Sequence, residues 1–202
     1  IAAVVIGGTS LFGGRGGVWS ALLGIFVIQS ISNGMDLLSL DISIKLLVTG
    51  AVHISQELAP MARQVGFDVT VLDPRTAFAT PERFPDVRLL AQWPDDVLPG
   101  LGVDRYTAFV ALTHDPKIDD PALHHALRQE CFYIGALGSR KTHGSRVERL
   151  KAQGFSDAAI ARIKAPVGLN IGAVSPAEIA ISILGEIIAA LRADRVTARA
   201  EQ

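Results

Sequence analysis

The spacing of hydrophobic and polar positions changes near residue 44. From there on, short apolar runs alternate with stretches in which apolar residues recur every three or four positions. The runs predict buried strands, and the periodic stretches predict amphipathic helices. The predicted strands cover residues 44–50, 67–73, 87–90, 106–112 and 131–135. Strands that alternate with helices predict an α/β domain with a parallel sheet.

The first predicted elements have the order of a Rossmann βαβ unit. Strand 44–50 ends at Gly50, a helix follows, and the next strand ends at the acidic residue Asp73. An acid about 20 residues beyond the first glycine is typical of the residue that binds ribose in such units. The predicted face of the helix is apolar and consists of Ile54, Leu58, Met61, Ala62 and Val65. We therefore expect a Rossmann-like, doubly wound parallel sheet over residues 44–193, preceded by an apolar helical segment.

The glycine fingerprint of dinucleotide-binding proteins is incomplete. Gly50, Val52 and Ser55 stand where G-x-G-x-x-G would place three glycines. The Val52 side chain would occupy the space through which the backbone usually approaches a pyrophosphate. The fold is thus expected without ordinary dinucleotide binding. Pro60 lies inside the helix, where it should remove a hydrogen bond or kink the axis.

Two further helices have clear start signals. Asp120 and Pro121 predict the N-cap and first residue of a helix that runs to Arg128. Ser175 and Glu178 form a capping box that predicts another helix. Its apolar face consists of Ile179, Ile183, Leu184, Ile187 and Leu191. The tail over residues 194–202 is polar and expected to fray.

The first 47 residues have a different composition. Their charged residues are Arg15, Asp36, Asp41 and Lys45, and they hold 8 of the 19 glycines. Residues 16–35 carry no charge and are long enough to cross a bilayer core as a helix; a buried core helix is the alternative. A secretory signal is disfavoured because no basic segment precedes the apolar run. The glycine-rich turn at 13–17 could bind an anion or act as a flexible connector.

Overall composition excludes several classes of protein. The chain has 202 residues, a formal net charge of −1 and one cysteine, Cys131. The charge argues against nucleic-acid binding by bulk electrostatics. The single cysteine excludes a disulfide framework and zinc sites built from several thiolates. Cys131 begins a predicted strand, so we interpret it as a small buried hydrophobe.

Polar residues cluster after four predicted strands, at 50–53, 73–75, 113–120 and 135–142. These strand ends should share one rim of the sheet, where ligands of open α/β sheets bind. In the fourth cluster, Ser139 opens a basic helix that either binds a phosphate or is simply solvated. The third cluster has three possible roles. It could hold a metal, or it could transfer protons with His114 as the general base and Asp115 orienting it. It could also form an ion-pair network in which Asp120 caps the next helix.

The remaining histidines have open interpretations. His53 either contacts a ligand at the rim or caps its helix. His124 and His125 are adjacent on a helix, so one should be exposed and the other partly buried. His143 lies in the basic helix and is expected to be solvated.

The first part of the chain resembles the C-terminal part of ribose/xylose-type ABC sugar permeases. The resemblance lies in residues 1–16, 22–24 and 32–34 and in a pattern of glycines over about 45 residues. The similarity covers only the end of such a permease. No transport function follows from it.

Seven blocks of sequence together resemble the C-terminal Rossmann domain of the xanthine dehydrogenase accessory (XdhC/CoxI) family. They are residues 49–56, 71–75, 78–85, 112–123, 133–140, 166–172 and 175–180. This resemblance covers residues 48–193 and implies a cytoplasmic accessory domain that binds molybdenum cofactor and inserts it into a xanthine dehydrogenase-type apoenzyme. The resemblance implies that the domain binds a cofactor rather than acting as a catalyst. It implies no catalytic residue and no metal ligand. The implied cofactor-binding residues are Gly50, His53, Asp73, Arg75, His114, Asp115, Lys117, Asp119, Gly135, Gly138, Ser139 and Arg140.

The start of the chain departs from that family, whose members usually carry an N-terminal domain with a cysteine. The permease-like residues 1–47 stand in its place, and Cys131 does not match that cysteine. The junction near Gly50 is interpreted as truncation or an assembly artefact, with a genuine gene fusion as the alternative. Two alternative functions are an NAD(P)-dependent oxidoreductase and a non-functional fusion carrying a permease fragment. Membrane contact through residues 16–35 and a homodimer are left open.

Overall fold

The computed structural model describes residues 22, 26–27 and 44–193. The chain divides into two units, Ile1–Ile42 and Ser43–Gln202, and the fold described below is that of the second. Apart from residues 22, 26 and 27, the predicted apolar helix at 16–35 lies outside the described residues, as do the glycine-rich turn and the polar tail. None of the helices in the described part of the chain is both long and apolar enough to span a membrane.

The second unit is built on a six-stranded parallel sheet, which confirms the predicted Rossmann-like class. The strand order is β3-β2-β1-β4-β5-β6, so the direction of winding reverses between β1 and β4. Ligands of doubly wound sheets bind at this reversal, beyond the carboxyl ends of the strands. The strands are β1 (Lys45–Thr49), β2 (Asp68–Leu72), β3 (Arg88–Leu90), β4 (Thr107–Ala111), β5 (Tyr133–Ala136) and β6 (Ile163–Lys164). β6 was not predicted, because two residues are too few to form a recognisable apolar run.

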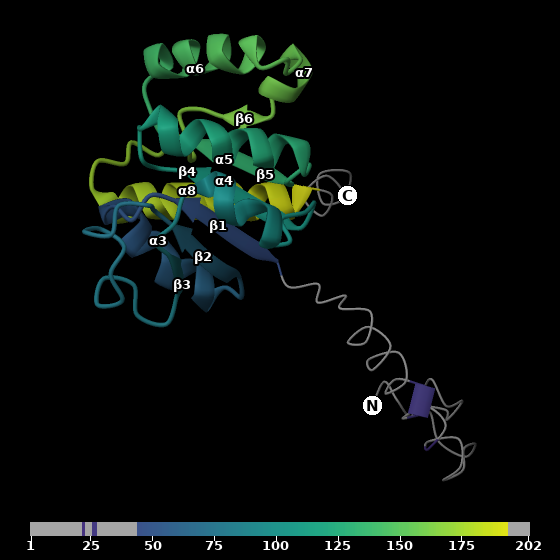
Figure 1. Cartoon of the computed structure of the whole chain (residues 1–202). Coiled ribbons are helices and arrows are strands. Elements are labelled where there is room, and N and C mark those ends of the chain that lie inside the picture. The colour runs from purple at the N-terminus through teal and green to yellow at the C-terminus, as the bar shows by residue number, and fades with distance from the viewer. Residues whose placement is uncertain (1–21, 23–25, 28–43, 194–202) are drawn as a thin grey trace. The chain divides into compact units, whose positions relative to one another are not determined.

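Helices cover both faces of the sheet (Figure 1). They are α3 (His53–Gln64), α4 (Pro94–Val97), the 3₁₀ turn η1 (Leu98–Gly100), α5 (Pro116–Arg128), α6 (Arg140–Ala152), α7 (Asp157–Ile160) and α8 (Pro176–Leu191). α3 and α8 pack against one face, and α4 and α5 pack against the other.

The central strands are apolar throughout because both of their faces are covered. In β1, Leu46 and Val48 belong to the core beneath α3 and α8, whereas Leu47 belongs to the core beneath α5. In β4, Val110 and Phe109 divide in the same way. Successive side chains of a strand point to opposite faces, so a strand buried on both sides has no polar face.

The start of α5 corrects the sequence prediction. The helix begins at Pro116 and not at Pro121, and its N-cap is Asp115, which accepts a hydrogen bond from the Lys117 amide at 2.9 Å. Asp115-Pro116 carries the same capping signal as Asp120-Pro121, five residues earlier. Pro121 is accommodated inside the helix.

Two other helix predictions have opposite outcomes. The Ser175 capping box is confirmed, since Ser175 Oγ accepts from the Glu178 amide and Glu178 Oε2 accepts from the Ser175 amide. The placement of Val65 on the buried face of α3 is wrong, because Val65 is the C-cap and is 54% exposed. The predicted residues Leu58 and Ala62 are buried, together with Ser55 and Ala59, which were not predicted.

Candidate functional site

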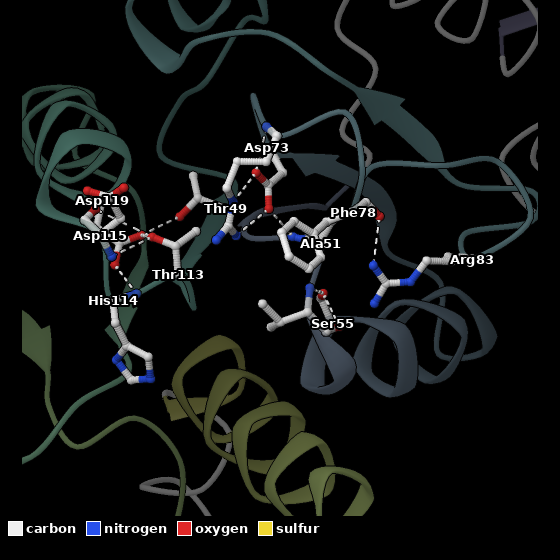
Figure 2. A network of polar contacts seen from close by, with 12 residues as sticks. Thr49, Ala51, Ser55, Asp73, Phe78, Arg83, Thr113, His114, Asp115 and Asp119 are labelled. Carbon is white, nitrogen blue, oxygen red and sulfur yellow. Dashed lines mark hydrogen bonds and ion pairs between the residues drawn. The ribbon is translucent and has the colours of Figure 1, made fainter.

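The loops at the sheet reversal lie in close contact. Gly50 has a φ of +107°, and a β-carbon there would lie 2.9 Å from Thr113 Cγ2, so the turn after β1 requires glycine. Buried Asp119 bridges the two loops (Figure 2). Its Oδ1 accepts from the hydroxyls of Thr49 at 3.2 Å and Thr113 at 2.6 Å, and its Oδ2 accepts from the His114 amide at 3.1 Å. Asp119 therefore ties the end of β1 to the loop after β4 at the sheet reversal.

The turn after β1 also satisfies its own amides. The Ala51 amide donates to Asp73 Oδ2 at 2.8 Å, and the Val52 amide donates to Ser55 Oγ at 2.9 Å. Ser55 Oγ in turn donates to the Val52 carbonyl at 2.7 Å. Dinucleotide-binding turns present such amides to a pyrophosphate. Here they are already engaged.

Asp73 is fully buried at the end of β2 and is paired with Arg75. The guanidinium donates from Nε to Oδ1 at 2.8 Å and from Nη2 to Oδ2 at 2.7 Å. Burial by itself raises the pKa of Asp73, but the bonds from Arg75 and Ala51 outweigh it and lower the pKa below 3.8. Arg75 also lies 4.7 Å above the Phe78 ring. Asp73 thus holds Arg75 in place and has no free oxygen directed at a ribose.

His114 stands in an unusual conformation at the rim. Its φ is +64°, a left-handed value that few non-glycine residues adopt, and the Asp119 carboxylate holds its amide. The side chain is exposed and points away from the polar network (Figure 2). Asp115 caps α5 instead of orienting the imidazole, so the predicted proton-transfer pair is not formed. Among the residues that the structure describes, no three His, Cys, Asp or Glu side chains gather as a metal site would require.

A pocket of about 260 Å³ opens between α5 and α6. Its lining combines cations, carboxylates and hydroxyls: His114, Pro116, Asp119, Asp120, Lys141, Thr142, Ser145, Arg146 and Arg149. Arg146 is only 2% exposed, and its Nη2 donates to the Leu137 carbonyl at 3.2 Å. Burial lowers the pKa of Arg146, while Asp119 and Asp120 oppose that effect. We call this space the α5–α6 pocket.

A larger cavity of about 470 Å³ lies on the other side of the start of α6. Loop 166–173, Leu137, Arg140, Ile179 and Ser182 line it. Glu186 of α8 holds this loop, accepting from Tyr133 Oη at 2.6 Å and from the Gly168 amide at 2.9 Å. Burial, reinforced by the Glu186 contact, raises the pKa of Tyr133, so it donates as a neutral phenol. We call this space the α6–α8 cavity.

The predicted site residues divide between these features. His114 and Asp119 line the α5–α6 pocket, and Arg140 lines the α6–α8 cavity. His53 and Lys117 are exposed at the first turns of their helices. Ser139 caps α6 by accepting from the Thr142 amide at 3.2 Å. The part of each residue in binding stays a prediction.

Local packing and backbone conformation explain why positions 135 and 138 are glycine. A β-carbon at Gly135 would lie 2.5 Å from Val167 Cγ2, and Gly138 has a φ of +134° with Thr142 close by. Arg146, Thr142, Ser145 and Glu186 were not among the predicted site residues. A basic helix after a glycine turn was the only signal for the first three, and nothing local distinguishes Glu186.

The remaining histidines and the cysteine differ in their outcomes. His143 is half-buried rather than solvated, with Nδ1 lacking a hydrogen-bond partner among the described residues. His124 and His125 are both half-buried and line one cavity of about 400 Å³, so the predicted contrast between them is wrong. Cys131 is buried as predicted, and burial raises the pKa of its thiol to about 12.

Fold and rim together define a Rossmann-like α/β domain in which the protein's own side chains accept hydrogen bonds from two amides of the turn after β1. Residues 46–187 match the family described as the XdhC Rossmann domain. The chain belongs to this family, and the resemblance expected from the sequence is confirmed.

Several relatives match the same domain. The chain is 34% identical to a probable xanthine dehydrogenase subunit from Bacillus subtilis, over 71% of its own length and 42% of the relative's. It is 29% identical to the molybdenum cofactor insertion chaperone PaoD of Escherichia coli, over 71% of its own length and 39% of the relative's. The crystal structure of a xanthine dehydrogenase from Bacillus halodurans superimposes with a TM-score of 0.64 at 32% identity, over 75% of this chain and 43% of that one. The chain thus spans about two-fifths of the length of these relatives.

The permease resemblance is confirmed as well. Over 52 residues, or 26% of the chain, the sequence is 48% identical to the ribose import permease protein RbsC of Bacillus subtilis. That match covers 16% of the permease.

Proposed function

We propose that this domain binds molybdenum cofactor as cargo and supports its insertion into a xanthine dehydrogenase-type apoenzyme. Membership of the XdhC family and the similarity to a molybdenum cofactor insertion chaperone support this function. The observation that carries it is the occupied turn after β1. The Ala51 and Val52 amides and the Asp73 carboxylate are already engaged, which favours a cargo other than a dinucleotide at this rim.

The α6–α8 cavity supports this proposal by its size and lining. Its volume of about 470 Å³ lies in the range of pockets that hold small organic cofactors. Leu137, Val167 and Ile179 offer apolar walls for a fused ring, and Asn170 and Ser182 offer hydrogen-bonding groups for its polar edge. Arg140 is exposed at the same cavity and would attract an anionic cargo.

The test is titration of the full chain with molybdenum cofactor and, separately, with NAD(H) and NADP(H). We expect saturable binding of the cofactor and none of the dinucleotides. Arg140→Ala should weaken cofactor binding, whereas Arg63→Ala, which changes an exposed cation in the last turn of α3 that does not line this cavity, should not. Tight dinucleotide binding with hydride transfer would favour the alternative of an oxidoreductase.

The partner is proposed from the same relatives. Leu169 and Ile171 line the α6–α8 cavity and are 44% and 55% exposed, so an apoenzyme that takes the cargo from this cavity would cover them. A Leu169→Ser, Ile171→Ser double variant, which adds no negative charge beside an anionic cargo, should lower activation of the apoenzyme more than it lowers affinity for the cofactor. Loss of cofactor binding in this variant would instead place both residues in the cargo site.

For residues 1–47 we propose no part in cofactor binding. A cytoplasmic location of residues 48–202, membrane contact through residues 16–35 and a homodimer remain proposals. Flotation of the full chain with lipid vesicles tests membrane contact, and sedimentation tests the dimer. Recovery of the whole chain as a monomer in the aqueous fraction would contradict both.

A further inference from the structure

The α5–α6 pocket contains a buried cation whose hydrogen bonds are incomplete. Arg146 is 2% exposed, yet its Nε and Nη1 find no hydrogen-bond partner among the described residues. A buried guanidinium with unsatisfied donors destabilises the fold unless another group compensates its charge. Its Nη2 bond to the Leu137 carbonyl fixes the group in place and leaves the other two donors unused.

The carboxylates that line this pocket are committed elsewhere. Asp119 accepts from three donors of the loops after β1 and β4. Asp120 receives a two-point contact from Arg149, through Nε and through Nη2 at 3.0 Å. Neither carboxylate forms a hydrogen bond or ion pair with Arg146. The positive charge of Arg146 therefore has no direct counterion in the pocket.

Other groups in the lining suit an anion. Lys141 adds a second cation, and Thr142 and Ser145 add hydroxyl donors from the same helix. At about 260 Å³ the pocket lies below the usual range for whole cofactors, so it fits one small group. A guanidinium is well matched to a tetrahedral oxyanion, because its charge and N–H groups complement the oxygens of the anion, which can also accept from the neighbouring hydroxyls.

We propose that the α5–α6 pocket binds the phosphate of a phosphomonoester, with the Arg146 guanidinium as its buried cation and Lys141, Thr142 and Ser145 completing the site. The pocket and the α6–α8 cavity both adjoin the start of α6, where Arg140 lines the cavity and Lys141 lines the pocket. One ligand could thus place a ring in the cavity and a phosphate in the pocket. That the phosphate is the one carried by the pterin cargo rests on the proposed function, whereas the oxyanion site does not.

The experiment titrates the full chain with inorganic phosphate by isothermal calorimetry. We expect saturable binding that Ser145→Asp weakens tenfold or more, because the new carboxylate enters the pocket from an exposed position without removing a buried group. Arg146→Lys should also weaken binding, since it keeps the charge but loses the fork. The matched control is Ala152→Asp, which adds the same charge to an exposed position at the far end of α6.

A second arm compares a phosphorylated pterin with the same pterin lacking its phosphate. Tighter binding of the phosphorylated form, lost in Ser145→Asp, supports the pocket as the phosphate site of the cargo. Failure of the wild-type chain to bind phosphate, or equal affinity in wild type and Ser145→Asp, overturns the site even where molybdenum cofactor still binds. Phosphate binding that depends on Ser145 and Arg146 supports the site even where molybdenum cofactor does not bind, and in that case only the proposed function fails.

Discussion

Two buried carboxylates at the rim differ because their partners differ in charge. Asp73 is paired with a guanidinium, which lowers its pKa against the effect of burial. Asp119 is surrounded by neutral donors, and burial, which dominates over the hydrogen bonds from Thr113 and Thr49, raises its pKa. The family resemblance implied that both bind the cofactor. In the structure, their oxygens face the protein's own loops.

Replacing Asp119 by Asn should destabilise the fold. An amide keeps one acceptor oxygen, so it cannot accept from Thr49, Thr113 and the His114 amide together. A buried donor left unpaired costs about 1–3 kcal/mol, which urea unfolding at neutral pH would measure. Asp120→Asn serves as control, because its partner Arg149 is 40% exposed and can turn to water. Equal losses in the two variants would contradict the bridging role of Asp119.

The Asp73–Arg75 pair predicts a pH-dependent difference between wild type and Arg75→Met. A carboxyl whose folded pKa is lowered contributes stability above its unfolded pKa, here about 3.8, and loses it as the pH falls through the folded value. In Arg75→Met the burial remains without the cation, so the pKa of Asp73 should rise and its charged form should destabilise the fold. The gap in unfolding free energy should be largest near pH 7 and narrow toward pH 4 and below. A gap independent of pH would contradict this account.

At the scale of elements, the helices that position the rim are held by contacts distant in sequence. Glu186 of α8 joins Tyr133 of β5 to the Gly168 amide, which fixes loop 166–173 against the sheet. Gly168 itself has a φ of +94°, and a β-carbon there would lie 2.4 Å from Ser182 Oγ. The wall of the α6–α8 cavity therefore depends on α8.

Glu186→Ala should loosen that wall. The change leaves the Tyr133 hydroxyl and the Gly168 amide without their acceptor, at a cost of about 1–3 kcal/mol. Hydrogen exchange should quicken at residues 166–173. Glu178→Ala, on the same helix, removes only the exposed capping box, so it should lower the unfolding free energy less than Glu186→Ala does and leave the exchange of loop 166–173 unchanged. Unchanged exchange of the loop in Glu186→Ala would exclude this anchoring.

The start of α5 shows why element boundaries could not be predicted securely. Asp115-Pro116 and Asp120-Pro121 carry the same local capping signal, and both prolines are compatible with a helix that begins at the first. In the structure Asp115 is the cap, and Asp120 lies inside the helix and pairs with Arg149 of α6. Such a contact between helices has no signature in either segment.

At the scale of the whole molecule, the stability of the second unit resides in two cores whose described residues begin at 44. β1 starts at Lys45, so the domain boundary expected near residue 47 stays a prediction, and a truncation is best placed before residue 44. A chain lacking residues 1–42 should unfold with the same free energy in urea as the full chain. A truncated chain that fails to unfold cooperatively would show that the first unit contributes to folding.

The sequence by itself determined the class of fold, the placement of most strands and the family, because apolar periodicity and turn residues act locally along the chain. It also indicated that Val52 and Ser55 interrupt the glycine fingerprint. Only the tertiary structure decided which polar groups remain available at the rim, since that depends on partners brought together from distant elements. Asp73 and Asp119 accept hydrogen bonds from such partners. Arg146 is buried, and two of its donor atoms have no hydrogen-bond partner among the residues that the structure describes. The sequence specifies which side chains are present, but packing determines which of their polar groups a ligand can reach.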